Sequence, residues 1–237
     1  MAELARGFLA VSAWRRRDDL PDEVMADLRV ALGWSRRVDE VRAVGDRVAD
    51  RWTVAGVREE ADGRGAVAQH TTLRSQRTWL VGERTGRVAV ILDFAAAGAT
   101  LATADVAGSV VDADVVLYPG SEPRRALFDG ERRMVASGGP LPVGDLSSGL
   151  AACSRRWAAN PFADRLPLGL AGVVPVADGD RYSVVDPAGL SLPMGGETDL
   201  MLLLALSGGH PVDLFGEWNG RCFTPLTVGA NEGVLSL

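Results

Sequence analysis

The sequence contains no lysine: all 25 of its basic residues, Lys and Arg counted together, are arginine. A GxxxxGK[ST] phosphate loop and a Schiff-base lysine are therefore both excluded. Histidine is almost as scarce, with only His70 and His210. A catalytic triad needs a histidine beside a nucleophile and an acid, and no GxSxG elbow accompanies either histidine. The sequence thus offers few of the residues on which common catalytic sites depend.

Cysteine is limited to Cys153 and Cys222, which lie far apart in the chain. Two cysteines without a CxxC spacing do not make a secreted disulfide scaffold. Neither cysteine has the close Cys or His neighbour of a structural zinc site. We therefore expect two reduced thiols packed as small hydrophobes, no metal or other cofactor, and a cytoplasmic location.

Long apolar runs are also missing. The longest strongly apolar run, residues 200–206, is much shorter than the ~20 residues that cross a bilayer. The apolar stretch near the N-terminus ends in Arg15, Arg16 and Arg17 and so does not resemble a signal peptide. These features predict a protein without a membrane partner.

The remaining composition is that of a globular protein. Of the 237 residues, 47% are hydrophobic and 24% are charged, and the formal net charge is −6. This balance is typical of a folded domain and unlike a disordered chain. The acidic total disfavours a general nucleic-acid binder.

The first half of the chain changes from helical to extended patterning. Pro21 suits the first position of a helix whose face carries Val24, Leu28 and Leu32, and a second helix is expected over residues 38–48. Strands are expected over residues 52–57 and 67–73, a hairpin over 77–94 that turns at 83–86, and a strand over 112–118. Both faces of the second hairpin arm are largely apolar, which predicts a strand covered on both sides.

The second half begins with a helix capped by Asp145, whose apolar stripe includes Cys153. Hairpins are expected over residues 181–194 and 212–228, and a fully buried helix over 200–206. The Asn219-Gly220 turn of the last hairpin would place Gly216 opposite Phe223. The whole pattern predicts an α+β fold: an N-terminal helical pair, then mostly antiparallel sheet with two further helices. We divide it into residues 1–50, 51–136 and 145–237, or a single compact domain.

Three sets of residues are candidates for chemistry. Asp112 and Asp114 share one face of a strand and could hold a hard cation with a third ligand, and His210, Asp213 or Glu217 could serve a hydrolase. Arginine pairs recur along the chain, and Arg124 and Arg125 follow Tyr118 where Ser121 and Pro123 favour the start of a short helix, which would make an anion site. Nucleic-acid binding through these pairs would require one continuous basic face.

Several segments resemble the region downstream of the zinc finger in bacterial SWIM zinc-finger family proteins. They are residues 77–95 (RTWLVGERTGRVAVILDFA), 112–120 (DADVVLYPG) with 123–127 (PRRAL), 206–220 (LSGGHPVDLFGEWNG) and 225–226 (PL). The order of the segments also matches, over about residues 20–230. The CxC and CxH pairs of that zinc finger are absent, so no zinc ligand is transferred to this chain.

The resemblance implies an accessory protein that contacts protein or nucleic acid, with the finger lost or carried elsewhere. Our leading interpretation is a non-catalytic protein-interaction or scaffold module whose partner is another protein. The residues expected at its interaction surface are Tyr118, Arg124, Arg125, Glu217 and Trp218. The alternatives are a metal- or histidine-dependent hydrolase using Asp112, Asp114 or His210, and a nucleic-acid-binding accessory protein.

Overall fold

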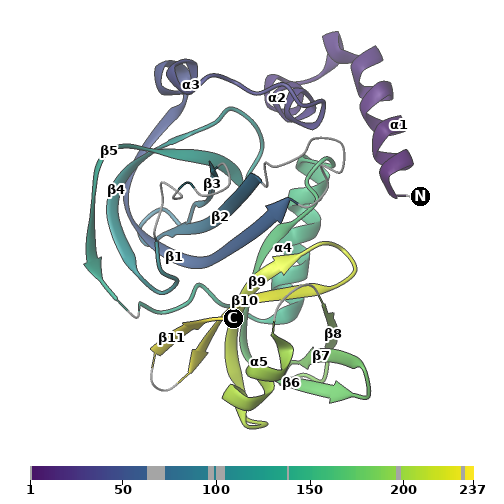
Figure 1. Ribbon diagram of the computed structural model, residues 1–237. Helices are drawn as coiled ribbons and strands as arrows, with labels where there is room; N and C mark the ends of the chain where they lie inside the picture. The colour runs from purple at the N-terminus through teal and green to yellow at the C-terminus, as the bar shows by residue number, and fades with distance from the viewer. Residues whose placement is uncertain are drawn as a thin grey trace.

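The computed structural model describes residues 2–62, 73–95, 99, 105–137, 139–195, 199–230 and 233–237. Over these residues the chain forms helices and two β-sheets, which confirms the predicted α+β class. The helical N-terminus lies over one end of a barrel, and the second sheet lies on the other side of that barrel (Figure 1). The strand expected over 67–73 and His70 fall almost entirely outside the described residues.

The N-terminal segment contains α1 (Ala2–Arg15), a 3-10 turn (Arg17–Asp19), α2 (Asp22–Ala31) and α3 (Val38–Val44). The helix α2 begins at Asp22, one residue after the predicted start, so Pro21 lies in the N-cap position. Asp22 and Glu23 occupy the first turn, where the helix dipole favours acids. The expected helix over residues 38–48 is wrong in its second half. A Cβ on Gly45 would lie 2.6 Å from the carbonyl oxygen of Leu117, so the chain passes close to the barrel there and continues as a strand.

The barrel consists of five strands in the order β1-β2-β3-β5-β4 and closes on itself. Neighbouring strands are antiparallel except β3 and β5, which are parallel. Because the barrel closes, none of its described strands is an edge strand. The strands are β1 (Asp46–Asp62), β2 (Leu73–Gly82), β3 (Val88–Ala95), β4 (Val110–Leu117) and β5 (Arg124–Ala136).

Alternating side chains divide the barrel strands into an inner and an outer face. Trp52 is fully buried inside and donates its indole N–H to the carbonyl oxygen of Ala113 at 3.1 Å. Trp79 and Val90 point outward and pack with Phe215 of the second sheet. The predicted covering of β3 on both faces is therefore confirmed over residues 88–91, and it fixes the barrel against the second sheet.

The second sheet has the order β11-β10-β8-β7-β6-β9, with an additional β9–β10 pairing. Its helix α4 (Leu146–Ala159) is as predicted: the Asp145 carboxylate accepts a hydrogen bond from the Ser148 N–H at 2.8 Å, and Cys153 is buried. The strands are β6 (Leu166–Asp178), β7 (Arg181–Val185), β8 (Ser191–Met194), β9 (Val212–Trp218), β10 (Phe223–Ala230) and β11 (Gly233–Ser236).

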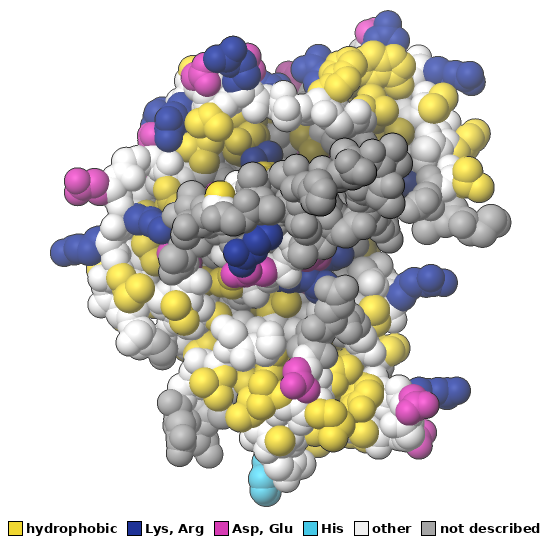
Figure 2. Space-filling model, viewed as in Figure 1, with side chains coloured by type: hydrophobic (Ala, Val, Ile, Leu, Met, Phe, Trp, Pro, Cys, Tyr) yellow, Lys and Arg dark blue, Asp and Glu magenta, His cyan; other side chains and the backbone are white. Residues whose placement is uncertain are grey.

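The prediction that the apolar helix over 200–206 is buried on all sides is wrong. In α5 (Leu200–Ser207) only Leu203 and Ser207 are buried, while Met201 is 63% exposed. Apolar side chains are visible on this part of the surface (Figure 2). A helix lying on one face of a sheet buries one side alone, whatever its composition.

The register of the last hairpin also differs from the prediction. Phe223 pairs with Trp218, and Gly216 pairs with Pro225. The Asn219 side chain accepts hydrogen bonds from the backbone N–H groups of residues 221 and 222, which lengthens the turn beyond two residues. The Phe223 ring nevertheless lies against Gly216, 2.9 Å from where a Cβ would be.

Candidate functional site

A cavity of about 690 Å³ lies between α2, the outer face of β2 and β3, and residues 160–165. We call it the arginine groove, because seven arginines line it against three acidic residues. The arginines come from distant parts of the sequence: Arg6, Arg29 and Arg36 from the N-terminal segment, Arg77, Arg124 and Arg125 from the barrel, and Arg165 from the segment before β6.

Four of these arginines have no carboxylate partner among the described residues. They are Arg6, Arg29, Arg36 and Arg125. The other three are engaged: Arg124 with Asp46, Arg77 with Glu217, and Arg165 with Glu60 and Glu217. In a chain of net charge −6, the groove is therefore a local concentration of positive charge.

Arg125 is the one of these four arginines whose guanidinium lies over an aromatic ring of the described residues. Its guanidinium lies 4.8 Å from the centre of the Tyr118 ring, a cation–π distance. Its Nε is buried and has no hydrogen-bond partner. The alternation of β5 and the parallel pairing of residue 125 with Val90 place this side chain on the outer face, beside the groove. No carboxylate of the described residues offsets the charge of this guanidinium, although it lies in the lining of the cavity.

Asp27 of α2 hydrogen-bonds to the loop between β4 and β5. Its two carboxylate oxygens each accept from the backbone N–H of Ser121 at 3.2 Å. Burial raises the pKa of Asp27 above its ordinary value, and the hydrogen bonds from Ser121 offset only part of that rise. This contact fixes α2, which forms one wall of the groove, against the loop between β4 and β5.

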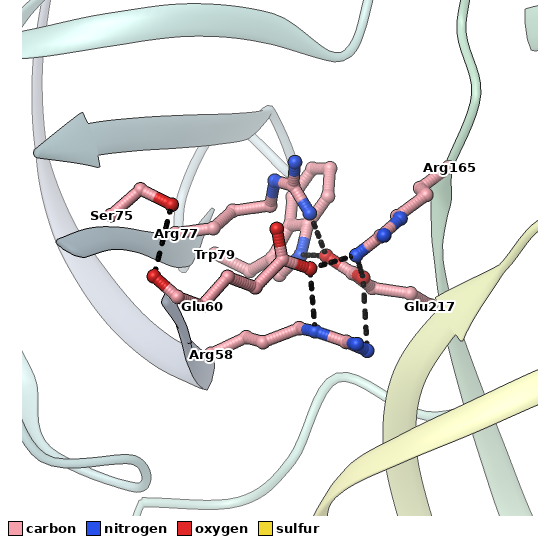
Figure 3. Close-up of polar contacts among 7 residues, drawn as sticks. All are labelled: Arg58, Glu60, Ser75, Arg77, Trp79, Arg165 and Glu217. Atoms are coloured by element: carbon pink, nitrogen blue, oxygen red, sulfur yellow. Dashed lines mark hydrogen bonds and ion pairs between the residues drawn. The ribbon is translucent and has the colours of Figure 1, made fainter. Parts of the chain in front are cut away.

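Glu217 lies in a cluster of polar contacts with Arg77, Arg165 and other side chains (Figure 3). Its side chain is 1% exposed and accepts from Trp79 Nε1 at 2.9 Å and Arg77 at 3.0 Å. Arg165 lies 3.2 Å from its second oxygen and also contacts Glu60, and Arg58 lies 3.8 Å away. Since β1, β2 and β9 all contribute, this cluster joins the barrel to the second sheet and fixes Arg77 and Arg165 at the groove.

The cluster shifts the pKa values of two of its members, Glu60 and Arg165. Burial alone would raise the pKa of Glu60, but the hydrogen bond and charge of Arg165, with the charges of Arg77 and Arg58, lower it below its ordinary value. Burial alone would lower the pKa of Arg165, but Glu60 and Glu217 raise it. Both shifts favour the charged forms of Glu60 and Arg165, which form an ion pair between β1 and the segment before β6.

Of the five residues predicted for the interaction surface, the structure places Tyr118, Arg124 and Arg125 in the lining of the groove. Glu217 lies behind the lining, where it holds Arg77 and Arg165. Trp218 packs instead against the core of the second sheet. The helix expected to start near Ser121 is wrong: residues 119–123 are a bend with a cis Glu122-Pro123 bond, and residue 124 begins a strand.

The candidate catalytic residues are not brought together. Asp112 and Asp114 are exposed on β4, and Asp112 pairs with Arg133. His210 follows α5, on the second sheet. Within the described part of the chain, no group of three His, Cys, Asp or Glu side chains could hold a metal ion.

The arginine pairs do not form the continuous basic face that nucleic-acid binding through them would need. Arg132 and Arg133 lie farther along β5, paired with Asp105 and Asp112, while Arg155 and Arg156 lie on α4. Of the pairs, only Arg124 and Arg125 line the groove together. Arg36 lines it without Arg37, and the other lining arginines stand alone in sequence: Arg6, Arg29, Arg77 and Arg165. Alternation in β2 places Arg77 on the same face as Trp79, a signal that could have indicated that these two residues act together.

No protein-family model matches the chain, and neither a curated protein nor a solved structure matches it. None of the described helices has the length and apolar character needed to span a membrane.

Proposed function

We propose that the protein is a non-catalytic binding module that holds an anionic ligand in the arginine groove. The observation that carries this proposal is the convergence of four arginines without carboxylate partners in the described structure on one cavity of an acidic protein. Bringing like charges together costs free energy, which a bound anion offsets. A cavity of about 690 Å³ is in the range of ligand-binding clefts.

Arginine is suited to this role because its planar guanidinium binds carboxylate and phosphate groups in pairs of hydrogen bonds. The cluster around Glu217 supports the proposal, since it fixes two of the lining arginines before any ligand arrives. Such preorganisation reduces the entropy lost on binding.

We also propose that the protein is related to bacterial SWIM zinc-finger proteins and that it is located in the cytoplasm. The free thiols of Cys153 and Cys222 support a reducing compartment. A protein partner is also part of the proposal, and the exposed side chains of Leu4, Phe8 and Val11 on α1 support it.

Calorimetric titration with inorganic polyphosphate tests the proposed function. We expect binding that weakens as salt rises, and a loss of at least about tenfold in affinity for Arg125→Gln, the cost of about one charge-assisted hydrogen bond. Arg181→Gln, an exposed arginine of β7 outside the groove, is the matched control and should bind like the wild type. No binding by the wild type at low salt, or equal losses in both variants, would show that the groove is not an anion site.

A further inference from the structure

We infer that α1 is a recognition helix, whose outer face docks in an apolar groove with an acidic rim on another protein. This inference rests on the protein partner that the proposed function includes, and it concerns a surface outside the arginine groove. Three observations carry it: the apolar stripe of α1, the width of the uncharged face around that stripe, and the position of the arginines at its end.

The inner face of α1 is packed against the rest of the chain. Ala10 is buried and forms a small core with Leu28 and Phe162. Ala13 and Trp14 pack against this core. The helix lies at the periphery of the molecule, beside α2 (Figure 1). The opposite side of α1 is therefore held in one orientation and left exposed to solvent.

The outer face of α1 carries an apolar stripe. Leu4 and Phe8 are each 76% exposed, and Val11 is 52% exposed. Because an α-helix has 3.6 residues per turn, their spacing of four and three residues places these side chains on one side of the helix. Apolar side chains are visible along this helix (Figure 2). Anchors at positions i, i+4 and i+7 are typical of a helix that binds in an apolar groove.

The uncharged part of this face is wider than the stripe itself. Ala5, Gly7 and Ser12 flank the three anchors on the helix surface, and beyond them Leu9 is 37% exposed. A stripe that pairs with one helix is narrow, whereas a broader uncharged face suits more than one neighbouring element. Nothing in the described structure lies within 4 Å of a Cβ added at Gly7, so no contact within the chain requires glycine there. A groove with two walls fits such a face.

The area of the face argues against a second copy of the chain as its partner. A helix of 14 residues is about 21 Å long and about 10–12 Å wide, so its outer side spans roughly 250 Å². A stable complex buries about 800 Å² on each partner. Two copies joined through α1 alone would fall well short of this area. A groove surrounds the helix on three sides and buries more of it.

The arginines at the end of α1 select the charge of the groove's rim. Arg15 follows Val11 by four residues and so continues the line of the anchors. Arg15 and Arg16 are exposed and have no carboxylate partner in the described part of the chain, while Arg17 lies 3.8 Å from Asp18. Carboxylates on the partner, where the end of α1 docks, complement these two charges and discriminate against a basic rim.

A lipid surface fits this helix less well. A helix that lies on an anionic bilayer has basic residues along the flanks of its apolar stripe. The flanks of this stripe hold Ala5, Gly7 and Ser12 instead. Of the arginines of α1, Arg6 lines the arginine groove and Arg15 lies at the end of the helix. The charge is therefore placed for a partner that meets one end of α1.

Fluorescence anisotropy with the full chain tests the inference. The probes are two labelled, designed helical hairpins whose two helices form a leucine-lined groove. The rim of one hairpin carries glutamates, and the rim of the other carries lysines. We expect the glutamate-rimmed hairpin to bind at least about fivefold more tightly. The double variant Arg15→Gln, Arg16→Gln should reduce this preference at least about threefold, because each exposed ion pair contributes little.

Phe8→Gln tests the apolar anchor. It should weaken binding of the glutamate-rimmed hairpin at least about tenfold, because large side chains at the centre of an interface carry most of the affinity. Phe8→Leu keeps an apolar anchor and should bind within about threefold of the wild type. Met201→Gln replaces an apolar side chain of α5 that is 63% exposed, and as the matched control it should bind like the wild type.

The competing occupants have their own measurements. Sedimentation velocity tests a second copy, and flotation with vesicles of phosphatidylglycerol and phosphatidylcholine tests a lipid surface. We expect neither self-association nor vesicle binding that depends on Phe8. A dimer or a vesicle-bound form that Phe8→Gln abolishes would overturn the inference and assign the face to that occupant.

The failure of this inference is distinguishable from the failure of the anion site. Phe8 is not in the lining of the arginine groove, so Phe8→Gln should leave the affinity for polyphosphate unchanged. If the hairpin binds through Phe8 but polyphosphate does not bind, the anion site fails and the recognition helix stands. No binding of the glutamate-rimmed hairpin, or equal binding by the wild type and Phe8→Gln, would overturn the inference.

Discussion

Trp79 donates its indole N–H to Glu217 at 2.9 Å, from the outer face of the barrel to the second sheet. The same carboxylate oxygen accepts from Arg77 at 3.0 Å, so one buried acid orients both an aromatic side chain and a cation of the groove. The lining of the arginine groove and the contact between the two sheets therefore depend on one residue.

Replacing that acid should destabilise the protein. Glu217→Gln removes the charge that compensates Arg77 and Arg165 while keeping the size of the side chain. We expect a loss of about 2–3 kcal/mol in the free energy of unfolding, less than for a fully buried pair because the arginines remain partly exposed. Urea unfolding measures it, with the exposed Glu131→Gln as control. Equal stability of the two variants would contradict the claim that Glu217 holds the barrel and the second sheet together.

Asp50 should make the turn between β2 and β3 sensitive to acid. Burial alone would raise its pKa, but hydrogen bonds from the Thr85 side chain and from the backbone of Arg84, Thr85 and Arg51 lower it below the ordinary value of 3.8. Since the pKa is lower in the folded state, this contribution is fully present above pH 3.8 and is lost as the pH falls through the folded pKa.

Asp50→Asn should therefore reduce the free energy of unfolding at neutral pH by about 1–3 kcal/mol. The difference from the wild type should narrow as the pH falls below 3.8. Urea unfolding across this range measures both effects, with the exposed Asp180→Asn as the charge-matched control. A difference between wild type and variant that stays constant with pH would argue against an ionised Asp50 as the acceptor.

The two sides of α5 should respond differently to truncation. Leu203 is fully buried, and Leu203→Ala should cost about 2–4 kcal/mol of stability through the cavity that it leaves. Met201 is 63% exposed, and Met201→Ala should change stability by less than about 1 kcal/mol. Thermal and urea unfolding of both variants test the assignment. A large loss for Met201→Ala would mean that this face is covered.

Gly216 should not tolerate a side chain. A Cβ there would lie 2.2 Å from the Thr224 carbonyl oxygen and 2.9 Å from the Phe223 ring. Gly216→Ala must shift β10 and should cost about 1–3 kcal/mol. At Gly144 nothing lies within 4 Å of an added Cβ, so Gly144→Ala is the control. Similar unfolding curves for the two variants would be inconsistent with this close approach.

The helices and strands that the sequence predicted correctly are those whose capping residues or hydrophobic pattern lie within a short segment. The stripe that includes Cys153 and the cap at Asp145 defined α4, and alternation around residues 77–94 defined the β2–β3 hairpin. β6 was missed because Pro167, Gly169 and Gly172 interrupt its apolar pattern. The exposure of α5 was not predictable from composition, because it depends on how many faces of the helix have neighbours.

The site was predictable only where its residues are close in sequence. Tyr118, Arg124 and Arg125 belong to one segment and were selected together. Arg29 and Arg165 reach the same groove from α2 and from the segment before β6, and barrel closure brings them there. In a chain without lysine, every surface cation is arginine, so arginine content alone could not distinguish the lining from the rest of the surface.

The location of the bound anion tests the central claim most directly. Backbone amide and arginine Nε–H signals can be followed by NMR during a titration with inorganic polyphosphate. We predict that the largest shifts lie at Arg29, Arg36, Ser121 and Arg125, around the arginine groove. Shifts spread evenly over the surface arginines, or centred on β6 to β8, would contradict the account.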